Sequence, residues 1–223
     1  LTAILKKYAA KFVFFQRAED GREEAIKIFR LGGIAIFMGF VVTFLFFKEA
    51  KDFINLSGEI PYSLIFLGAS LIFLIGLVDD IIYLTPKIRL FFQFSIGILI
   101  WFYGLRIGNI DISFLGSSFS DLVLPPVLNL FFTVVFLVGT TNAINWIDGL
   151  DGLATGISSI FIFSLITISL FQNDVNSINI FILLLGSCLA FLKSNYYPAN
   201  IIMGDVGSYF LGSFLSIASI KIF

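Results

Sequence analysis

Long runs of apolar residues constrain the fold of this chain more than any other feature. A helix that spans a lipid bilayer needs about 17 to 25 mainly apolar residues, because the bilayer core has no water to satisfy exposed backbone groups. Hydrophobic residues make up 58% of the 223 residues and charged residues only 13%, with a mean hydropathy of +1.01. The sequence therefore predicts an all-α polytopic membrane protein, a multi-helix transmembrane bundle.

Seven apolar runs follow an N-terminal stub. We expect spans at 31–47, 62–78, 89–105, 123–142, 153–171, 177–193 and 206–223. The first residues, LTAILKKYAAK, read as the end of an earlier helix rather than as a signal peptide, and the last residue lies within an apolar run. We therefore expect residues 1–223 to form a single transmembrane domain that is truncated at both ends.

One segment between spans has a different pattern. Residues 104–118, GLRIGNIDISFLGSS, alternate apolar and polar residues and contain several glycines. This alternation is typical of a strand rather than a helix. It predicts a short β-hairpin on the periplasmic side of the membrane.

The basic residues indicate the orientation, because short cytoplasmic loops carry an excess of Lys and Arg. If residues 6–30 are cytoplasmic, strict alternation places ten basic residues on that side: Lys6, Lys7, Lys11, Arg17, Arg22, Lys27, Arg30, Lys87, Arg89 and Lys193. The other side has four: Lys48, Lys51, Arg106 and Lys221. The same alternation places three polar clusters on the cytoplasmic face: GLVDDIIYLTPKIRLFFQ, NAINWIDGLDGLA and SNYYPANIIMGDVGS.

The composition also limits the available chemistry. The net charge of −1 does not favour a nucleic-acid partner, and the single cysteine, Cys188, lies in an apolar run where a packing role is expected. The chain has no histidine, which is the commonest general base and metal ligand. Any chemistry must use carboxylates, amides, lysines and the backbone.

Asp79 and Asp80 end the second predicted span. Acidic residues are costly near a bilayer and are usually functional there, although the cost is smaller at a helix end. Two solvated capping residues are the alternative, and the presence of three such clusters on one face favours function. Adjacent residues on a helix point about 100° apart, so we expect the two carboxylates to have different roles.

The second cluster places four polar residues at three-residue intervals: Asn142, Asn145, Asp148 and Asp151. On a straight helix each step of three residues falls about 60° short of a full turn, so the four side chains cannot face one ligand. We expect Gly149 and Gly152 to break the helix, so that both carboxylates and nearby peptide N–H groups surround one ligand.

In the third cluster, Asp205 lies between Gly204 and Gly207 just before a predicted helix. A helix N-terminus favours phosphate, and magnesium prefers one or two carboxylates together with phosphate oxygens. The pattern therefore points to Asp205 as a magnesium ligand. A role as a helix N-cap is the alternative.

Together with RLGGIAIF at 30–37, the three clusters resemble those of the polyprenyl-phosphate N-acetylhexosamine-1-phosphate transferases. These are membrane enzymes of glycosyltransferase family 4 that initiate O-antigen, teichoic acid and other cell-envelope glycans. The related phospho-N-acetylmuramoyl-pentapeptide transferases typically have a lysine where this chain has Tyr83. The resemblance is therefore nearer to the undecaprenyl-phosphate N-acetylglucosamine-1-phosphate branch.

The resemblance implies a reaction and a set of roles. An N-acetylhexosamine-1-phosphate passes from a UDP-sugar to polyprenyl phosphate, with release of UMP, at the cytoplasmic face of a bacterial inner membrane. Asp205 would hold magnesium, with manganese as the alternative ion; Asp79 would contact or deprotonate the lipid phosphate, with Asp80 supporting the catalytic site. Substrate binding is implied for Lys27, Arg30, Asn142, Asn145, Asp148, Gly149, Leu150 and Asp151. A homodimer is left open.

The first cytoplasmic loop departs from the family pattern. Glu24 and Ile26 stand where the family usually has histidine and lysine, whereas Arg30 is retained and Lys27 is shifted by one position. A degenerate or truncated homologue without catalysis is therefore one alternative. An ion-coupled transporter is another, and it would need acidic residues near the middle of the spans.

Overall fold

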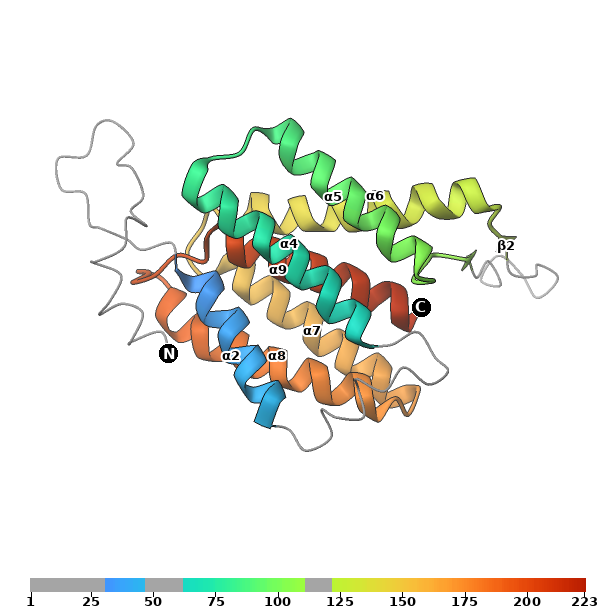
Figure 1. Cartoon of the computed structure of the whole chain (residues 1–223). Coiled ribbons are helices and arrows are strands. Elements are labelled where there is room, and N and C mark those ends of the chain that lie inside the picture. The colour runs from blue at the N-terminus through green and yellow to red at the C-terminus, as the bar shows by residue number, and fades with distance from the viewer. Residues whose placement is uncertain (1–30, 47–61, 111–121) are drawn as a thin grey trace.

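The computed structural model describes residues 31–46, 62–110 and 122–223. Within these ranges the chain forms seven helices and one pair of two-residue strands (Figure 1). The helices are α2 (Gly32–Phe46), α4 (Tyr62–Ile82), α5 (Pro86–Phe102), α6 (Pro126–Ile147), α7 (Leu153–Phe171), α8 (Val175–Asn195) and α9 (Gly204–Ile222). The strands are β1 (Asn109–Ile110) and β2 (Leu122–Val123).

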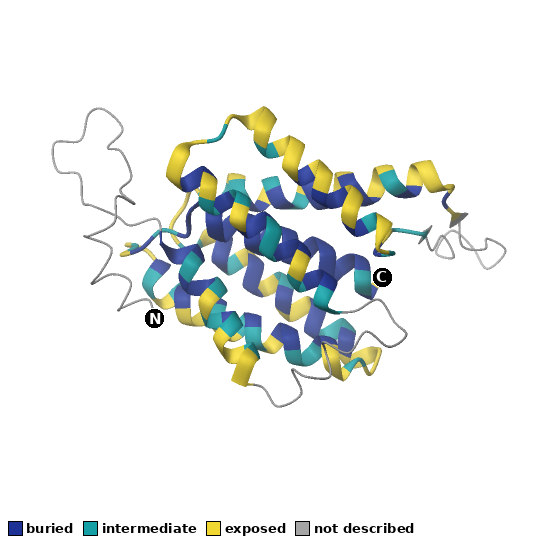
Figure 2. Cartoon of the chain, viewed as in Figure 1, coloured by how far each residue is buried: buried dark blue, intermediate teal, exposed yellow. Residues whose placement is uncertain are grey.

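Helix α9 forms the centre of the bundle. Every residue of α9 except Asp205 and Lys221 is buried, and the helix contacts α2, α4, α6 and α7 (Figures 1 and 2). A helix that is buried on all sides is expected in the core of a larger assembly of helices. The residues at the start of α9 are therefore held by neighbours on several sides.

Aromatic rings and glycines bring α2 and α9 together. Phe40 of α2 packs against Phe210 and Phe214 of α9, with ring centroids 6.2 and 5.5 Å apart. Nearer the start of both helices, a Cβ atom on Gly33 would lie 2.1 Å from the backbone nitrogen of Gly207. Only glycine permits this backbone contact, so the α2–α9 crossing depends on the absence of side chains at both positions.

Each of the seven predicted spans overlaps one of the described helices. By length and composition, four helices within the described residues can cross a membrane: α4, α6, α7 and α8. Helices α2 and α5 have only 15 and 17 residues, and α9 contains four serines, which lower its hydropathy. The helical membrane-protein class is thus confirmed, whereas the count of seven spans stays a prediction.

Two helices extend further at their C-terminal ends than the predicted spans do. Helix α4 continues beyond residue 78 to Ile82, and α6 continues beyond residue 142 to Ile147. The polar residues there stay helical because side chains and backbone groups of neighbouring helices satisfy them. The aspartate pair and both asparagines therefore project from rigid helical turns rather than from loops.

The predicted hairpin lies only in part within the described residues. Strands β1 and β2 pair antiparallel, with Asn109 opposite Val123 and Ile110 opposite Leu122. Residues 111–121 lie outside the described ranges, and β2 comes after the segment 104–118. The periplasmic position of this region stays a prediction, as does the single-domain organisation.

Candidate active site at the start of helix α9

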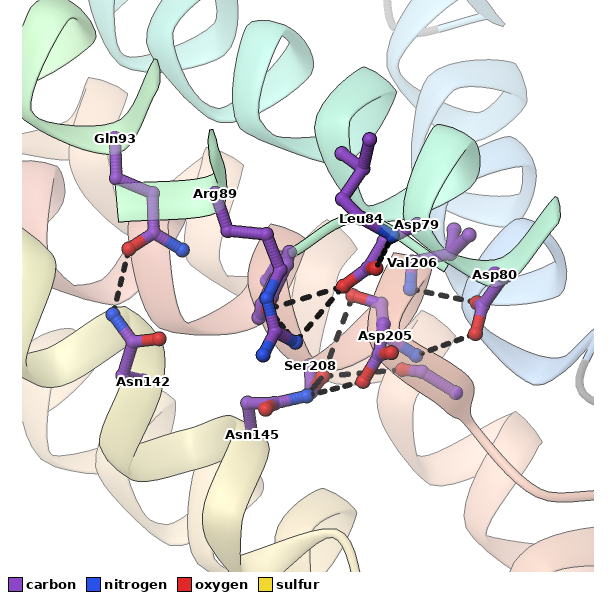
Figure 3. A network of polar contacts seen from close by, with 12 residues as sticks. Asp79, Asp80, Leu84, Arg89, Gln93, Asn142, Asn145, Asp205, Val206 and Ser208 are labelled. Carbon is purple, nitrogen blue, oxygen red and sulfur yellow. Dashed lines mark hydrogen bonds and ion pairs between the residues drawn. The ribbon is translucent and has the colours of Figure 1, made fainter. Parts of the chain in front are cut away.

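The three polar clusters meet at the start of α9. The end of α4 brings Asp79 and Asp80, the end of α6 brings Asn145 and Asp148, and Asp205 lies in the first turn of α9 (Figure 3). These contacts bring the three clusters together at one end of the bundle, and the cytoplasmic position of that end stays a prediction. Asp205 is not the N-cap, because α9 begins at Gly204 and Met203 occupies that position.

Asp79 is buried in an ion pair with Arg89 of α5. The Asp79 side chain is 4% exposed, and its Oδ2 lies 3.0 Å from Nη1 of Arg89. Its Oδ1 accepts a 2.8 Å hydrogen bond from the backbone N–H of Leu84. The Arg89 Nη1 also donates to the hydroxyl of Tyr209 at 3.0 Å, so the guanidinium joins α4, α5 and α9. In this arrangement Asp79 faces Arg89 rather than open space.

Asp80 faces the start of α9. Its Oδ1 accepts from the backbone N–H of Asp205 at 3.3 Å, and its Oδ2 accepts from that of Val206 at 3.0 Å. The two neighbouring carboxylates thus have different partners on different helices. The two carboxylates therefore have different contacts, as their directions on the helix predict, and their different roles stay a prediction.

Helix α6 holds the same turn of α9 from the opposite side. Nδ2 of Asn145 donates to Oδ1 of Asp205 at 2.5 Å and to Oγ of Ser208 at 2.9 Å. Oδ2 of Asp148 accepts from the backbone N–H of Gly204 at 3.1 Å. Both predicted residues therefore contact the first turn of α9.

Asn142 lies one helical turn away from this group. Its Nδ2 donates to Oε1 of Gln93 at 2.6 Å, between α5 and α6 (Figure 3). Gln93 is fully buried, and its Nε2 has no hydrogen-bond partner within the part of the chain that the structure describes. Asn142 thus contacts α5 beside the pocket and does not line it.

Asp148 and Asp151 do not converge on one point. Oδ2 of Asp151 accepts from the backbone N–H of Ala199 at 2.9 Å, whereas Asp148 bonds to Gly204. The helix break is present, with Gly152 at a φ of 72°, where glycine is favoured. The structure therefore does not bring the two carboxylates together, and their contact with one ligand stays a prediction. Each carboxylate fixes a different part of the segment before α9.

A pocket of about 270 Å³ opens beside Asp205. It is lined by Asn145, Trp146, Asp148, Gly149, Ile202, Gly204 and Asp205. Four predicted site residues are among them, whereas Asp79, Asp80, Asn142, Leu150 and Asp151 are not. Leu150 is exposed, as is Trp146 at the rim. Lys27 and Arg30 lie outside the described residues.

The residues at the pocket fit a metal held mainly by substrate oxygens. Within the described ranges, no group of three or more His, Cys, Asp or Glu side chains is arranged to hold a metal ion. Asp205 uses Oδ1 to accept from Asn145, and its Oδ2 accepts no hydrogen bond from the described residues. Magnesium commonly uses one or two carboxylates, with phosphate and water oxygens completing its shell.

Sequence reasoning missed Arg89, Tyr209, Gln93 and Ser208. The spacing of Arg89 and Gln93 was a usable signal, because residues four apart lie on one face of a helix. Both side chains indeed face the polar groups of neighbouring helices. Tyr209 and Ser208 gave no comparable signal, since single hydroxyl residues are common in such helices.

The bundle has several apolar helices long enough to span a membrane, which defines the class of multi-pass membrane proteins. Polar residues gather where α4 and α6 end and α9 begins, and this end of the bundle contains the candidate site. Residues 62–223 match the family described as glycosyl transferase family 4. The chain belongs to this family, as the three motifs predicted.

Several relatives resemble the chain over most of its length. A probable undecaprenyl-phosphate N-acetylglucosaminyl 1-phosphate transferase of Bacillus subtilis (strain 168) is 34% identical, over 99% of the chain and 58% of the relative. An undecaprenyl-phosphate alpha-N-acetylglucosaminyl 1-phosphate transferase of Thermotoga maritima is 31% identical, over 100% and 62%. A phospho-N-acetylmuramoyl-pentapeptide-transferase of Caldanaerobacter subterraneus is 33% identical, over 92% and 66%. The chain thus spans about three fifths of these relatives.

Proposed function

We propose that the protein transfers an N-acetylhexosamine-1-phosphate from a UDP-sugar to polyprenyl phosphate and releases UMP. The observation that carries this proposal is the polar pocket at the start of α9. There Asn145 orients Oδ1 of Asp205, and Oδ2 accepts no hydrogen bond from the residues that the structure describes. The names of the relatives from Bacillus subtilis and Thermotoga maritima supply the reaction class.

The reaction would proceed by attack of a lipid phosphate oxygen on the β-phosphorus of the UDP-sugar. A bond forms between that oxygen and the β-phosphorus, and the bond from the β-phosphorus to the bridging oxygen breaks, so that UMP leaves. A phosphate monoester already carries about −1.5 to −2 charges at pH 7, so the nucleophile needs little deprotonation. Positioning and charge neutralisation are then the main tasks of the protein.

Magnesium at Asp205 would supply part of the charge neutralisation. Arg89 supplies a second positive charge near the start of α9, and its bonds to Asp79 and Tyr209 use only Nη1. An arginine held in this way presents its remaining N–H groups in a fixed orientation, which suits phosphate oxygens. We propose that Asp79 orients Arg89 toward the substrate. Direct contact between Asp79 and the lipid phosphate would require Arg89 to move.

The nucleotide sugar would lie in the pocket that Asn145, Asp148 and Gly149 line. Trp146 is 82% exposed at the pocket rim, where its ring offers a flat apolar surface to a base or sugar. The contributions of Lys27, Arg30, Asn142, Leu150 and Asp151 to substrate binding remain proposals from the resemblance.

We also propose that the helices form seven spans of a bacterial plasma membrane, with the site facing the cytoplasm and the strand pair outside. The ten-to-four distribution of basic residues supports this orientation. Cysteine labelling in a Cys188-free background tests it at residues 85, 149 and 199. Labelling of any of these positions only from the periplasmic side would contradict the shared cytoplasmic site. A homodimer is a further proposal, to be tested by the mass of the detergent-solubilised protein.

Transfer of radiolabelled sugar phosphate tests the function directly. Membranes that contain the protein are incubated with polyprenyl phosphate and a panel of UDP-sugars, and label is measured in the lipid fraction. We expect label from at least one UDP-N-acetylhexosamine. Its absence with every donor would favour the non-catalytic homologue. An ion-coupled transporter is disfavoured because Asp79, Asp148 and Asp205 lie at helix ends.

A further inference from the structure

We infer that Asp80 and Asp148 are positioning residues that act through the first turn of α9, rather than ligands of the metal. Together they supply, from two other helices, the hydrogen-bond acceptors that α9 lacks at its own N-terminus. The consequence for catalysis rests on the proposed function, in which Asp205 in that turn holds magnesium. The part of the inference that concerns the position of the first turn of α9 does not depend on the proposed function.

The N-terminus of a helix leaves its first backbone N–H groups without partners. Helix α9 begins after Met203, whose side chain makes no capping hydrogen bond. Three consecutive N–H groups instead donate to carboxylates: that of Gly204 to Asp148, and those of Asp205 and Val206 to the two oxygens of Asp80. A helix usually takes its capping acceptor from the residue just before it. Here the acceptors come from Asp80 in α4 and from Asp148 at the end of α6.

The backbone on the other side of this turn is also held. The carbonyl oxygens of Ile202 and Met203 accept hydrogen bonds from the N–H groups of Gly32 and Gly33, at 3.0 and 2.8 Å. A Cβ atom on Gly76 of α4 would lie 2.6 Å from the carbonyl oxygen of Asp205. The peptide units around Asp205 therefore have little freedom to move, because α2 and α4 contact them directly.

The charges favour the same interpretation. A free helix N-terminus attracts phosphate through its N–H groups, but here Asp80 and Asp148 already accept from three of them. The turn thus offers substrate the Asp205 carboxylate rather than backbone donors. The remaining orientation of that carboxylate comes from Asn145. The family resemblance implies catalysis for Asp80 and nucleotide binding for Asp148. In the structure these two aspartates set the position of Asp205.

Residue-resolved amide hydrogen exchange of the purified chain in detergent tests this division of roles. In Asp80→Ala we expect exchange at Asp205 and Val206 to become about two- to thirtyfold faster, the range that corresponds to loss of a helix N-cap. In Asp148→Ala the increase should fall on Gly204 instead. Asp151→Ala is the matched control, because Asp151 bonds to Ala199 in the preceding segment, and it should leave 204–206 unchanged.

Unchanged exchange at 204–206 in both alanine variants would overturn the inference. If an alanine variant loosens the whole bundle, Asp80→Asn is the deciding variant, because it keeps one acceptor oxygen. A smaller increase in amide exchange confined to residues 205 and 206 supports the inference. No increase in exchange overturns it. A transfer assay with a magnesium titration separates the roles further. If Asp80→Asn removed the magnesium dependence as fully as Asp205→Asn without altering exchange, Asp80 would be a ligand itself. Wild-type protein without transfer activity would instead contradict the proposed function and leave the exchange result standing.

Discussion

Asn145 and Asp205 are joined by a 2.5 Å hydrogen bond from the amide Nδ2 to the carboxylate Oδ1. The bond connects the end of α6 to the first turn of α9, and so it links two polar motifs that lie 60 residues apart in the sequence. Asp205 lines the pocket, and within the described part of the chain its Oδ2 accepts no hydrogen bond. In the proposed reaction, the bond from Asn145 determines which carboxylate oxygen of Asp205 binds the metal.

Replacement of Asn145 by alanine should therefore weaken the binding of magnesium that transfer requires. A hydrogen bond to a charged group contributes about 1.5 to 3 kcal/mol, so the magnesium concentration at half-maximal rate should rise roughly ten- to a hundredfold. Asn142→Ala is the matched control, because Asn142 bonds to Gln93 and not to Asp205. Equal magnesium dependence in the two variants would contradict the role of Asn145.

The ion pair of Arg89 and Asp79 predicts coupled effects on stability. Arg89→Gln leaves a carboxylate that is 4% exposed without its cation, which costs about 3 kcal/mol when one partner of a buried pair is removed. The double variant Asp79→Asn, Arg89→Gln should recover part of this loss, because no buried charge remains unpaired. Thermal unfolding in detergent measures both, with Arg106→Gln, at an exposed position, as a neutral control. Additive losses in the double variant would show that the two residues do not interact.

Gly76 predicts a steric effect on the site. A Cβ atom there would lie 2.6 Å from the carbonyl oxygen of Asp205 and 2.8 Å from Cα of Val206, so Gly76→Ala must displace the start of α9. We expect a loss of about 1 to 3 kcal/mol in unfolding free energy together with a steep loss of transfer. Gly139→Ala in α6 is the control, since its Cβ would meet nothing within 4 Å. A neutral Gly76→Ala would show that this contact does not position Asp205.

Sequence patterns predicted the helices well because apolar runs of span length have few other structures available. They also predicted that the three motifs meet, because alternation of spans fixes which ends share a face. They did not predict that Asp80 and Asp148 would bond to backbone groups of α9, because such partners depend on the distance between helices. The four-residue spacing of Arg89 and Gln93 marks one face of α5, but the partner of Arg89 follows from the approach of α5 to α4, which that spacing does not encode.

At the other end of the bundle, Asp174 predicts a pH dependence of stability. Burial raises the pKa of the Asp174 carboxyl, but hydrogen bonds from Tyr62 and Ser177 and the charge of Lys221 lower it by more, so the pKa lies below its ordinary value. A lowered folded-state pKa stabilises the protein above the unfolded-state pKa of about 3.9, and this contribution is lost as the pH falls through the folded-state pKa.

The unfolding free energy of the wild type should therefore decrease on acidification below about pH 4 more than that of Asp174→Asn. Tyr62→Phe, which removes the hydroxyl that donates to both carboxylate oxygens, should give an intermediate slope. Denaturant unfolding at several pH values measures these slopes. Identical slopes in all three proteins would contradict the stabilising role of the charged form of Asp174.

The central claim is that the pocket at the start of α9 performs magnesium-dependent sugar-phosphate transfer through Asp205. The most direct measurement is UMP release from UDP-N-acetylhexosamine by purified protein with polyprenyl phosphate, as a function of magnesium, in the wild type and in Asp205→Asn. This variant nearly keeps the shape of the side chain but removes the charge that would hold the metal. We predict magnesium-dependent release by the wild type and a loss of about a hundredfold or more in Asp205→Asn. Equal rates and equal magnesium dependence in the two proteins would contradict the claim.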